Sequence, residues 1–216
     1  MSDSANIKTA STSMNELSAK FADLHKKTSA LLADSKHLKA NHMNGSAYVL
    51  SEKELLCLDR SNGDSRYPYG QDGFNLWVYA SGYMHANEGL LSTFLRAANG
   101  QEPNVAFFAG KQSGDNDYQV TPLFSVPKKT EDRKGLVRYT VFSPSAAYFV
   151  TELGSLRFGV RVFATPSRSI SFSINIENIG DQDESFFLSS FLNPFLRHQL
   201  HTVSYTHLTL PTTSRV

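Results

Sequence analysis

The chain has 216 residues, of which 40% are hydrophobic and 19% are charged, and its formal net charge is +1. This composition is typical of a globular protein, and the near-neutral charge argues against nucleic acid, which usually meets a clustered basic surface. The single cysteine, Cys57, excludes an internal disulfide and favours a reducing compartment. No stretch approaches the roughly 18 consecutive apolar residues of a membrane span. We therefore expect a cytoplasmic protein without nucleic-acid or membrane partners.

The N-terminal region predicts one helix. Residues 1–12 are small and polar, which predicts disorder. Ser13 and Glu16 form a capping box that opens an amphipathic helix from about Met14 to Ala40, in a helix and linker region of residues 13–45. Such a helix either packs against its own domain or pairs with another helix, because leucine recurs every seven residues along one face. The recurring residues are Leu17, Leu24, Leu31 and Leu38.

A β-sandwich domain is predicted over residues 46–202, and its clearest part is an antiparallel meander from Leu156 to Asn193. Apolar and polar residues alternate over 156–162 and again over 170–176, as on strands with one buried face. The third segment, 185–193, is apolar on both parities, which predicts a strand covered on both faces. Turn residues separate the three strands.

Further short strands precede the meander, with turn residues between them. Together they give about nine strands, several spaced by 8–12 residues, which favours a large sandwich. The predicted fold class is therefore mainly β, an antiparallel β-sandwich of the super-sandwich type preceded by one amphipathic helix. The additional strands are Tyr48–Leu58, Phe74–Ser81, Val105–Ala109, Tyr118–Val126, Leu136–Phe142 and Ala146–Leu153.

Residues 59–73 combine glycine, proline, aspartate and arginine, which predicts a long loop of the kind that often carries function. Aromatic residues are dense from this loop onward to Tyr83. Aromatic rings suit the apolar C–H faces of sugars, but they are equally typical of strands and cores. A saccharide site and a packed sheet therefore both remain open at this point.

Five residues are the candidate saccharide contacts: Asp64, Arg66, Tyr67, Asp72 and Trp77. Arg66 and Asp72 would hydrogen-bond hydroxyl or phosphate groups, and Tyr67 or Trp77 would stack against a sugar ring. Asp64 and Asp72 also have the residue type of a glycosidase carboxylate pair, although aspartate is common in tight turns.

Complete catalytic or metal-binding motifs are absent from the sequence. There is no phosphate-binding loop, nucleophile elbow, HExxH or CxxC pattern. His198 and His201 form an HxxH pair without a persuasive third ligand, and His85 and Glu88 have no nucleophile beside them. We expect no cofactor and no catalytic residue in this chain.

The last residues differ from the rest of the chain. Residues 203–213 resemble a translated frame of the transposase mosaic end used in sequencing libraries. The likeness predicts that 203–216 are adapter-derived and that the chain is the front of a longer protein whose reading frame was cut near Thr202.

The β region, from about Tyr48 to His201, resembles the N-terminal super-β-sandwich of cellobiose-phosphorylase-like and β-glucan-phosphorylase-like enzymes. The resemblance rests on the strand pair 169–178 and 187–194, with contributions from 62–70 and 107–110. In that family a helical linker and an (α/α)₆ barrel follow the sandwich. The barrel supplies the acid that protonates the glycosidic oxygen while phosphate attacks.

The resemblance implies a non-catalytic sandwich of an inverting glycoside phosphorylase that acts on β-linked gluco-oligosaccharides, with inorganic phosphate as the parent enzyme's co-substrate. Its partners would be an oligosaccharide, a C-terminal catalytic domain and, within a homodimer, a second copy. Two alternatives remain: a free-standing carbohydrate-binding or interaction module, and the front domain of a glycoside hydrolase or glucan synthase.

Overall fold

The computed structural model describes residues 3–34, 47–58, 65–89, 91–93, 105–112, 117–123, 138–192 and 197–198. The protein is mainly β, with antiparallel sheets and one N-terminal helix, which confirms the predicted fold class. The elements are α1 (Asp3–Ala33), β1 (Ala47–Ser51), β2 (Glu54–Leu58), β3 (Arg66–Gln71), β4 (Phe74–Tyr79), β5 (Met84–Glu88), β6 (Leu91–Thr93), β7 (Val105–Gln112), β8 (Tyr118–Pro122), β9 (Arg138–Phe142), β10 (Ala147–Leu153), β11 (Leu156–Ala164), β12 (Ile170–Asn178), β13 (Phe187–Leu192) and β14 (Arg197–His198).

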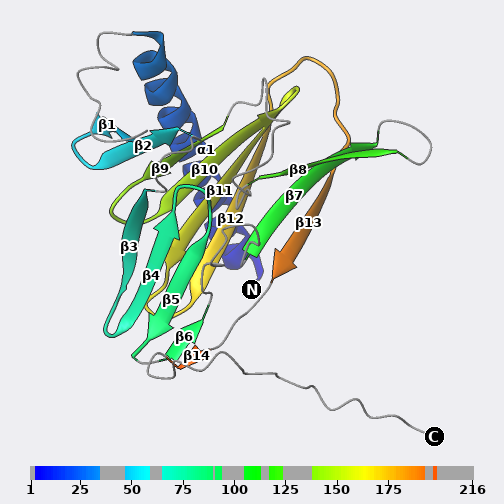
Figure 1. Cartoon of the computed structure of the whole chain (residues 1–216). Helices are drawn as coiled ribbons and strands as arrows, with labels where there is room; N and C mark the ends of the chain where they lie inside the picture. Colours follow the sequence, from blue (N-terminus) through cyan, green and yellow to red (C-terminus); the bar gives the residue numbers. More distant parts are fainter. Residues whose placement is uncertain are drawn as a thin grey trace, which may run out of the picture.

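The strands that the structure describes form three sheets (Figure 1). Sheet A has six strands in the order β1-β2-β9-β10-β11-β12. Sheet B has five strands in the order β14-β6-β5-β4-β3, and sheet C has three in the order β13-β7-β8. Sheet A forms one layer, and sheets B and C face its inner side, so the molecule is a sandwich whose second layer is divided in two.

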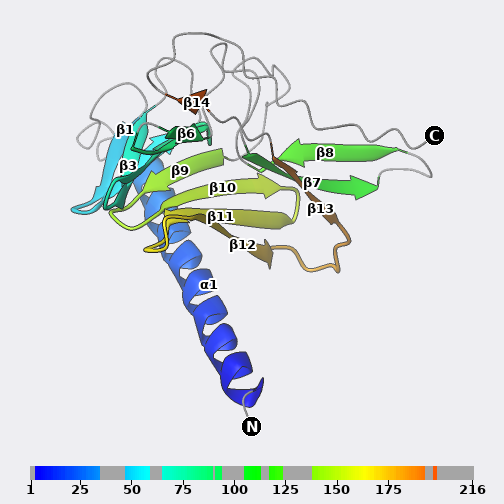
Figure 2. The same cartoon turned by 90° about the horizontal axis from the view of Figure 1, so that it is seen from below.

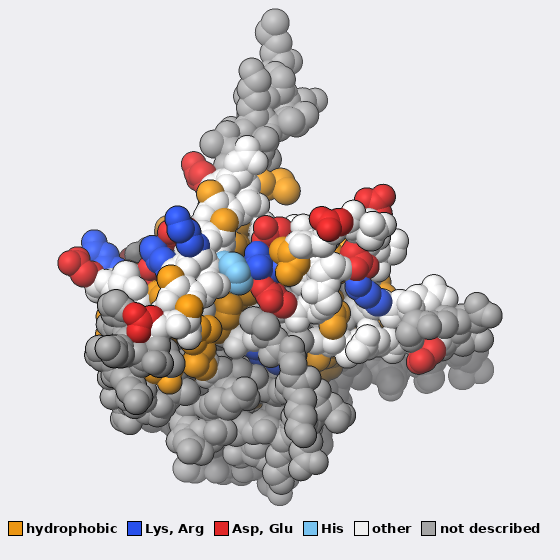
Figure 3. Space-filling model, turned by 90° about the horizontal axis from the view of Figure 1, so that it is seen from above, with side chains coloured by type: hydrophobic (Ala, Val, Ile, Leu, Met, Phe, Trp, Pro, Cys, Tyr) orange, Lys and Arg blue, Asp and Glu red, His pale blue; other side chains and the backbone are white. Residues whose placement is uncertain are grey.

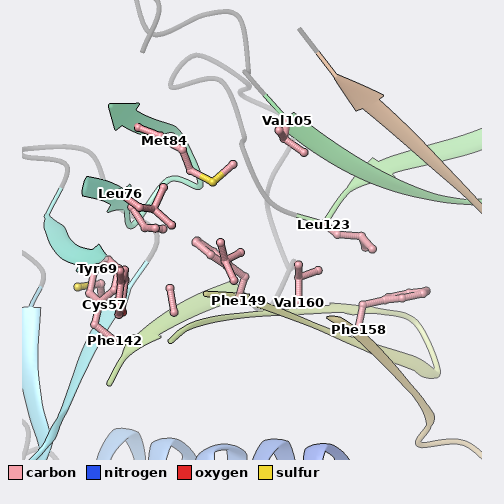
Figure 4. Close-up of a cluster of buried hydrophobic side chains, with 14 of the residues drawn as sticks. Cys57, Tyr69, Leu76, Met84, Val105, Leu123, Phe142, Phe149, Phe158 and Val160 are labelled. Carbon is pink, nitrogen blue, oxygen red and sulfur yellow. The ribbon is translucent and has the colours of Figure 1, made fainter. Parts of the chain in front are cut away.

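The main core lies between sheet A and the two smaller sheets (Figure 4). Phe149 and Val160 point up from sheet A, Leu76 and Met84 point down from sheet B, and Val105 does so from sheet C. The alternation of apolar residues along each strand places them on this one face. Cys57 belongs to the same core and is 3% exposed.

The outer face of sheet A is covered by α1 (Figure 2). Leu24 is fully buried and Phe21 is 3% exposed, and the ring of Phe21 meets that of Tyr148 edge to face at 5.5 Å. Gly159 makes this approach possible, because a Cβ atom there would lie 2.5 Å from the Phe21 ring. The helix therefore packs against its own domain, which is one of the two interpretations that its leucine repeat allowed.

Charged residues border the contact between helix and sheet (Figure 3). Lys20 and Lys27 on α1 place their ammonium nitrogens 2.6 and 3.2 Å from the Glu54 carboxylate on β2. Glu54 also accepts a hydrogen bond from Ser51 at 2.8 Å. The helices that the structure describes include none with the length and apolar character needed to span a bilayer.

The helix differs from its prediction at both ends. It begins at Asp3, so the prediction of disorder over 1–12 is wrong for residues 3–12. This segment holds no glycine or proline that would stop a helix from extending past the capping box at Ser13. The helix ends at Ala33, and the predicted continuation over 35–40 lies outside the described residues.

Most predicted strands are present with shifted ends. The predicted strand Tyr48–Leu58 is instead a hairpin of β1 and β2, with a turn at Glu52 and Lys53. Residues 66–71, predicted as loop, form β3. Pro68 is tolerated there because β3 is the last strand of sheet B and needs no hydrogen-bonded neighbour on its outer side.

The predicted meander is wrong in its third strand. β11 and β12 pair along their whole length, from Leu156 opposite Asn178 to Ala164 opposite Ile170. β13 does not join them, but pairs with β7 in sheet C, where Phe187 lies opposite Gly110. All six residues of β13 are exposed, so the predicted cover on both faces is also wrong. The segment 179–186 carries the chain from one layer of the sandwich to the other before β13 begins.

Candidate functional site

The candidate site is the outward face of sheet B, where β3, β4 and β5 lie side by side. On β4, Phe74, Leu76 and Val78 are buried toward the core, so the alternate residues project outward. Residues directly opposite one another in antiparallel strands share a face. The register therefore sets two outward rows, Pro68–Trp77–His85 and Arg66–Tyr79, with Asn75 and Asn87 forming a third.

Arg66 organises the aromatic residues of this face. Its guanidinium carbon lies 5.1 Å from the ring centroid of Trp77 and 5.8 Å from that of Tyr79. Its Nη1 also donates a hydrogen bond to the Tyr79 hydroxyl at 3.2 Å. A cation above an aromatic face is attracted by the ring quadrupole, so these contacts hold Arg66 and orient Trp77.

His85 lies beside Trp77 on the next strand. Burial lowers the pKa of its imidazole, and the positive charge of Arg66 lowers it further. His85 is consequently neutral at neutral pH. Its Nε2 atom is buried and makes no hydrogen bond among the described residues.

The structure brings together two of the five predicted contact residues, Arg66 and Trp77. Tyr67 points the other way, into the core, where its ring stacks on Phe142 at 5.9 Å. A contact between Tyr67 and a sugar on the outward face is therefore ruled out by its orientation. Asp64 lies outside the described residues.

Asp72 is separated from Arg66 along the same hairpin. It occupies the turn between β3 and β4 with a φ of 53°, followed by Gly73 with a φ of 85°. Five residues of extended strand lie between Arg66 and Asp72, which separates the two by about 20 Å. Asp72 is therefore a turn residue, as its alternative interpretation held, and it does not share a site with Arg66.

Sequence reasoning missed Pro68 and both asparagines of this face, and it did not include His85 among the candidate contacts. The available signal was the pair Asp72-Gly73, because Asp-Gly between alternating segments is a strong indication of a two-residue hairpin. With that hairpin fixed, the register would have placed Pro68 beside Trp77 and Arg66 beside Tyr79.

Chemically, this face combines an aromatic ring, a guanidinium and two amides with an imidazole. Guanidinium and amide groups suit hydroxyl-bearing ligands, and the indole offers an apolar surface. Among the described residues, no group of three or more histidine, cysteine, aspartate or glutamate side chains is arranged to hold a metal ion. The residues of this face that the structure describes include no nucleophile paired with a base.

Comparisons with known proteins do not assign the chain to a group. No protein-family model matches it, and no curated protein sequence does.

Proposed function

We propose that this chain is the non-catalytic β-sandwich of a carbohydrate-active enzyme and that the outward face of sheet B contacts saccharide. The parent enzyme in this proposal is an inverting glycoside phosphorylase that acts on β-linked gluco-oligosaccharides. The observation that carries the saccharide contact is the row Pro68–Trp77–His85 with Arg66 held above the indole. The link to a phosphorylase rests on the sequence resemblance of the β region.

The geometry supports binding in two ways. The outward side chains of β3, β4 and β5 form rows that run across three strands, which suits an extended β-linked glucan better than a compact ligand. Arg66 and the two asparagines bring hydrogen-bond donors to the same side as Trp77, so ring contact and hydroxyl contact occur together. The polar residues fix orientation, while the aromatic surface contributes contact area.

Trp77 is the only tryptophan in the chain, so intrinsic tryptophan fluorescence reports on this face alone. Titration with cellotetraose should shift and quench the emission in a saturable manner. Maltotetraose, which has the same composition with α linkages, should give a weaker response. Equal responses to both sugars, or none to either, would contradict the proposal.

Variants at two aromatic positions test whether saccharide binds to this face or elsewhere on the surface. Trp77→Ala should abolish cellotetraose binding when it is measured by calorimetry, while far-UV circular dichroism remains unchanged. Tyr118→Ala is the matched control, because Tyr118 is 54% exposed on β8 of sheet C. Equal loss in both variants would place binding elsewhere.

Variants of Arg66 test whether its guanidinium group contributes to saccharide binding. Arg66→Ala should weaken binding without unfolding the protein, since the side chain is exposed and its partners are Trp77 and Tyr79. Arg66→Lys keeps the charge but loses the planar fork, so it should recover only part of the affinity. Unchanged affinity in a folded Arg66→Ala protein would remove this residue from the site.

The catalytic part of the proposal has a separate test. The present chain should not release sugar 1-phosphate from cellobiose or longer β-glucans in phosphate buffer. In the parent enzyme, cleavage should require inorganic phosphate. Cleavage at the same rate without phosphate would identify a hydrolase instead.

A further inference from the structure

The hairpin of β11 and β12 contains three arginines, and one of them has no carboxylate partner among the described residues. Arg157 lies 2.8 Å from the carboxylate of Glu152 and 2.9 Å from that of Glu177. Arg168, in the turn of the hairpin, pairs with a glutamate of β5. Arg161 makes no ion pair or hydrogen bond through its side chain in the described structure, and its Nε is buried without an acceptor. Its positive charge is therefore not offset within this part of the chain.

The register of sheet A explains why Arg157 and Arg161 differ. Both lie on the outer face of the sheet, because the residues that alternate with them on β11 are in the core. The cross-strand neighbours of Arg157 are glutamates on both sides, whereas those of Arg161 are Tyr148 on β10 and Ser173 on β12. Such neighbours have Cβ atoms about 4.5–5.5 Å apart. The sheet thus supplies carboxylates to the first arginine and only hydroxyl groups to the second.

The ring of Phe163 holds the guanidinium group of Arg161 in place. The guanidinium carbon lies 4.3 Å from the centroid of this ring, a close cation–π contact. Phe163 lies on the same outer face, two residues further along β11, and its cross-strand neighbour on β12 is Ser171. The guanidinium group is therefore held close to the sheet, beside Ser171 and Ser173.

Polar groups of β12 continue this row toward α1, which crosses the same face of the sheet (Figure 2). The hydroxyl groups of Ser171 and Ser173 make no hydrogen bond in the described structure. Asn175 accepts a hydrogen bond from Ser18 of α1 through its Oδ1 at 2.6 Å, which leaves its amide nitrogen as a donor. One guanidinium group, two hydroxyl groups and one amide thus lie along neighbouring positions of one sheet face.

We propose that Arg161, Ser171, Ser173 and Asn175 form a binding site for a phosphate group, which we call the outer-face phosphate site. The guanidinium group would hold two phosphate oxygens, and the hydroxyl and amide groups of β12 would donate to the others. The site lies on the outer face of sheet A and the saccharide face lies on sheet B, so this inference does not rest on the proposed function.

A phosphate group suits these residues better than a carboxylate does. A carboxylate has two oxygens, which a single guanidinium group can occupy. A phosphate monoester has three acceptor oxygens and a charge of about −1.5 to −2 at neutral pH, so it can accept from β11 and β12 together. Lys20 of α1 adds positive charge nearby, because its ammonium group lies 5.9 Å from the ring centroid of Tyr148, the neighbour of Arg161 on β10. Lys20 also pairs with Glu54.

Nuclear magnetic resonance of the full chain tests the site directly. Inorganic phosphate is titrated at neutral pH against chloride, at constant ionic strength. The Nε–H resonance of Arg161 and the amide resonances of Ser171 and Ser173 should shift in a saturable manner. Acetate at the same concentrations should shift them less, because it offers fewer acceptors. Phenyl phosphate distinguishes the source of the group: tighter binding than inorganic phosphate would assign an organic phosphate ester, and equal binding would assign the free ion.

Two arginines of the same hairpin provide matched variants. Arg161→Gln should weaken phosphate binding by at least about tenfold, since hydrogen bonds to charged groups contribute strongly to affinity. Arg168→Gln removes the same charge from the exposed turn and should leave binding unchanged. Arg161→Lys keeps the charge but loses the planar fork, so it should restore only part of the affinity. The amide resonances of Ser171 and Ser173 report binding in all three variants.

A change that preserves all charges provides a second test. Ser173→Ala removes only a hydroxyl group from the exposed side of β12 and should weaken phosphate binding several-fold, while far-UV circular dichroism remains unchanged. This variant keeps the proposal testable if Arg161→Gln does not fold.

Four outcomes would overturn the inference. Equal weakening in Arg161→Gln and Arg168→Gln would show that the ion responds to net charge and not to a site. Equal shifts with acetate and phosphate would identify a carboxylate site instead. Full affinity in a folded Ser173→Ala protein would remove β12 from the site. Shifts that grow linearly with both phosphate probes, without saturation, would show that no site exists on this face.

Discussion

Two apolar surfaces of this protein differ in how far they are buried. Beneath α1, on the outer face of sheet A, Leu24 is fully buried and Phe21 is 3% exposed. On β13, Leu188 and Leu192 are 41% and 60% exposed although the strand, FLSSFL, consists mostly of apolar residues. The outer face of sheet A is covered by α1. Among the described residues, no comparable layer covers β13. An apolar pattern indicates which residues would be stabilised by burial. The topology decides which of them are buried.

The largest expected effect is a difference between two leucine truncations. Leu24→Ala should lower the free energy of unfolding by about 2–5 kcal/mol, because it leaves a cavity between helix and sheet. Leu192→Ala should change it by less than about 0.5 kcal/mol, as is usual for exposed positions. Urea unfolding measures both. An equal loss of unfolding free energy in the two variants would show that β13 is covered in solution and that the two surfaces do not differ.

A second pair of variants tests how tightly each surface is packed. A Cβ atom on Gly159 would meet the ring of Phe21, and one on Gly110 would meet the ring of Phe187. Phe21 is enclosed, so Gly159→Ala should cost about 1–3 kcal/mol through overpacking. Phe187 is 37% exposed and can turn away, so Gly110→Ala should cost less.

A double mutant tests whether the contact with Phe21 causes the loss of stability in Gly159→Ala. If the clash with Phe21 causes the loss in Gly159→Ala, adding Phe21→Ala should relieve it, and the two changes should not be additive. Additive losses would show that Gly159 matters for its backbone and not for the approach of the helix.

The strands were largely predictable because their alternation is local. β11 and β12 lie where the apolar and polar residues alternate, and the burial of α1 follows its leucine repeat. The partner of β13 was not predictable in this way. The pairing of β13 depends on which sheet the chain reaches after the segment 179–186. The hydrophobic pattern of a strand does not predict which strand it pairs with.

The candidate site was predictable only in part for a similar reason. Residue composition predicts Arg66 and Trp77 as contact residues, and the structure places them in contact. It predicts Tyr67 and Asp72 together with them because all four are close in sequence. A strand sends adjacent residues to opposite faces, which separates Tyr67 from Arg66, and a hairpin turn separates Asp72 from both.

Acid should weaken the helix-covered surface through Glu54. Burial opposes ionisation of this carboxyl group, but hydrogen bonds from Lys20, Ser51 and Lys27 outweigh it and lower its pKa to about 2. A lowered pKa in the folded state gives stability that is present above the ordinary value of 4.5 and is lost as the pH falls toward 2. We expect a loss of about 1–3 kcal/mol over this interval, since the two lysines are partly exposed.

Glu54→Gln provides the control for this acid effect. It should be less stable than the original protein at neutral pH and should lose the dependence on pH between 4.5 and 2 that Glu54 contributes. Urea unfolding at a series of pH values measures both proteins. An unchanged slope in the variant would assign the acid sensitivity to other carboxyl groups.

The smallest expected effect concerns His25, which lies where α1 meets β9 and β11. Burial lowers its pKa, and Arg157 lowers it further, against weaker opposing effects of Glu152 and Glu177. Arg157 Nη2 lies 3.0 Å from His25 Nε2 and donates to it, which requires that nitrogen to be unprotonated. The other ring nitrogen, Nδ1, lies 3.1 Å from the hydroxyl oxygen of Tyr139 and can then act as the donor.

The neutral form of His25 is therefore the one that supports the docked helix. Because the unfolded chain binds the proton more tightly, the stability that His25 contributes is present above pH 6.5 and falls as the pH drops below that value. The imidazole proton resonances should titrate with a midpoint below 6.5, and His25→Gln should remove this shallow dependence on pH. A midpoint above 6.5 would mean that Glu152 outweighs Arg157 and that the helix is held more firmly in acid, the reverse of what the contacts predict.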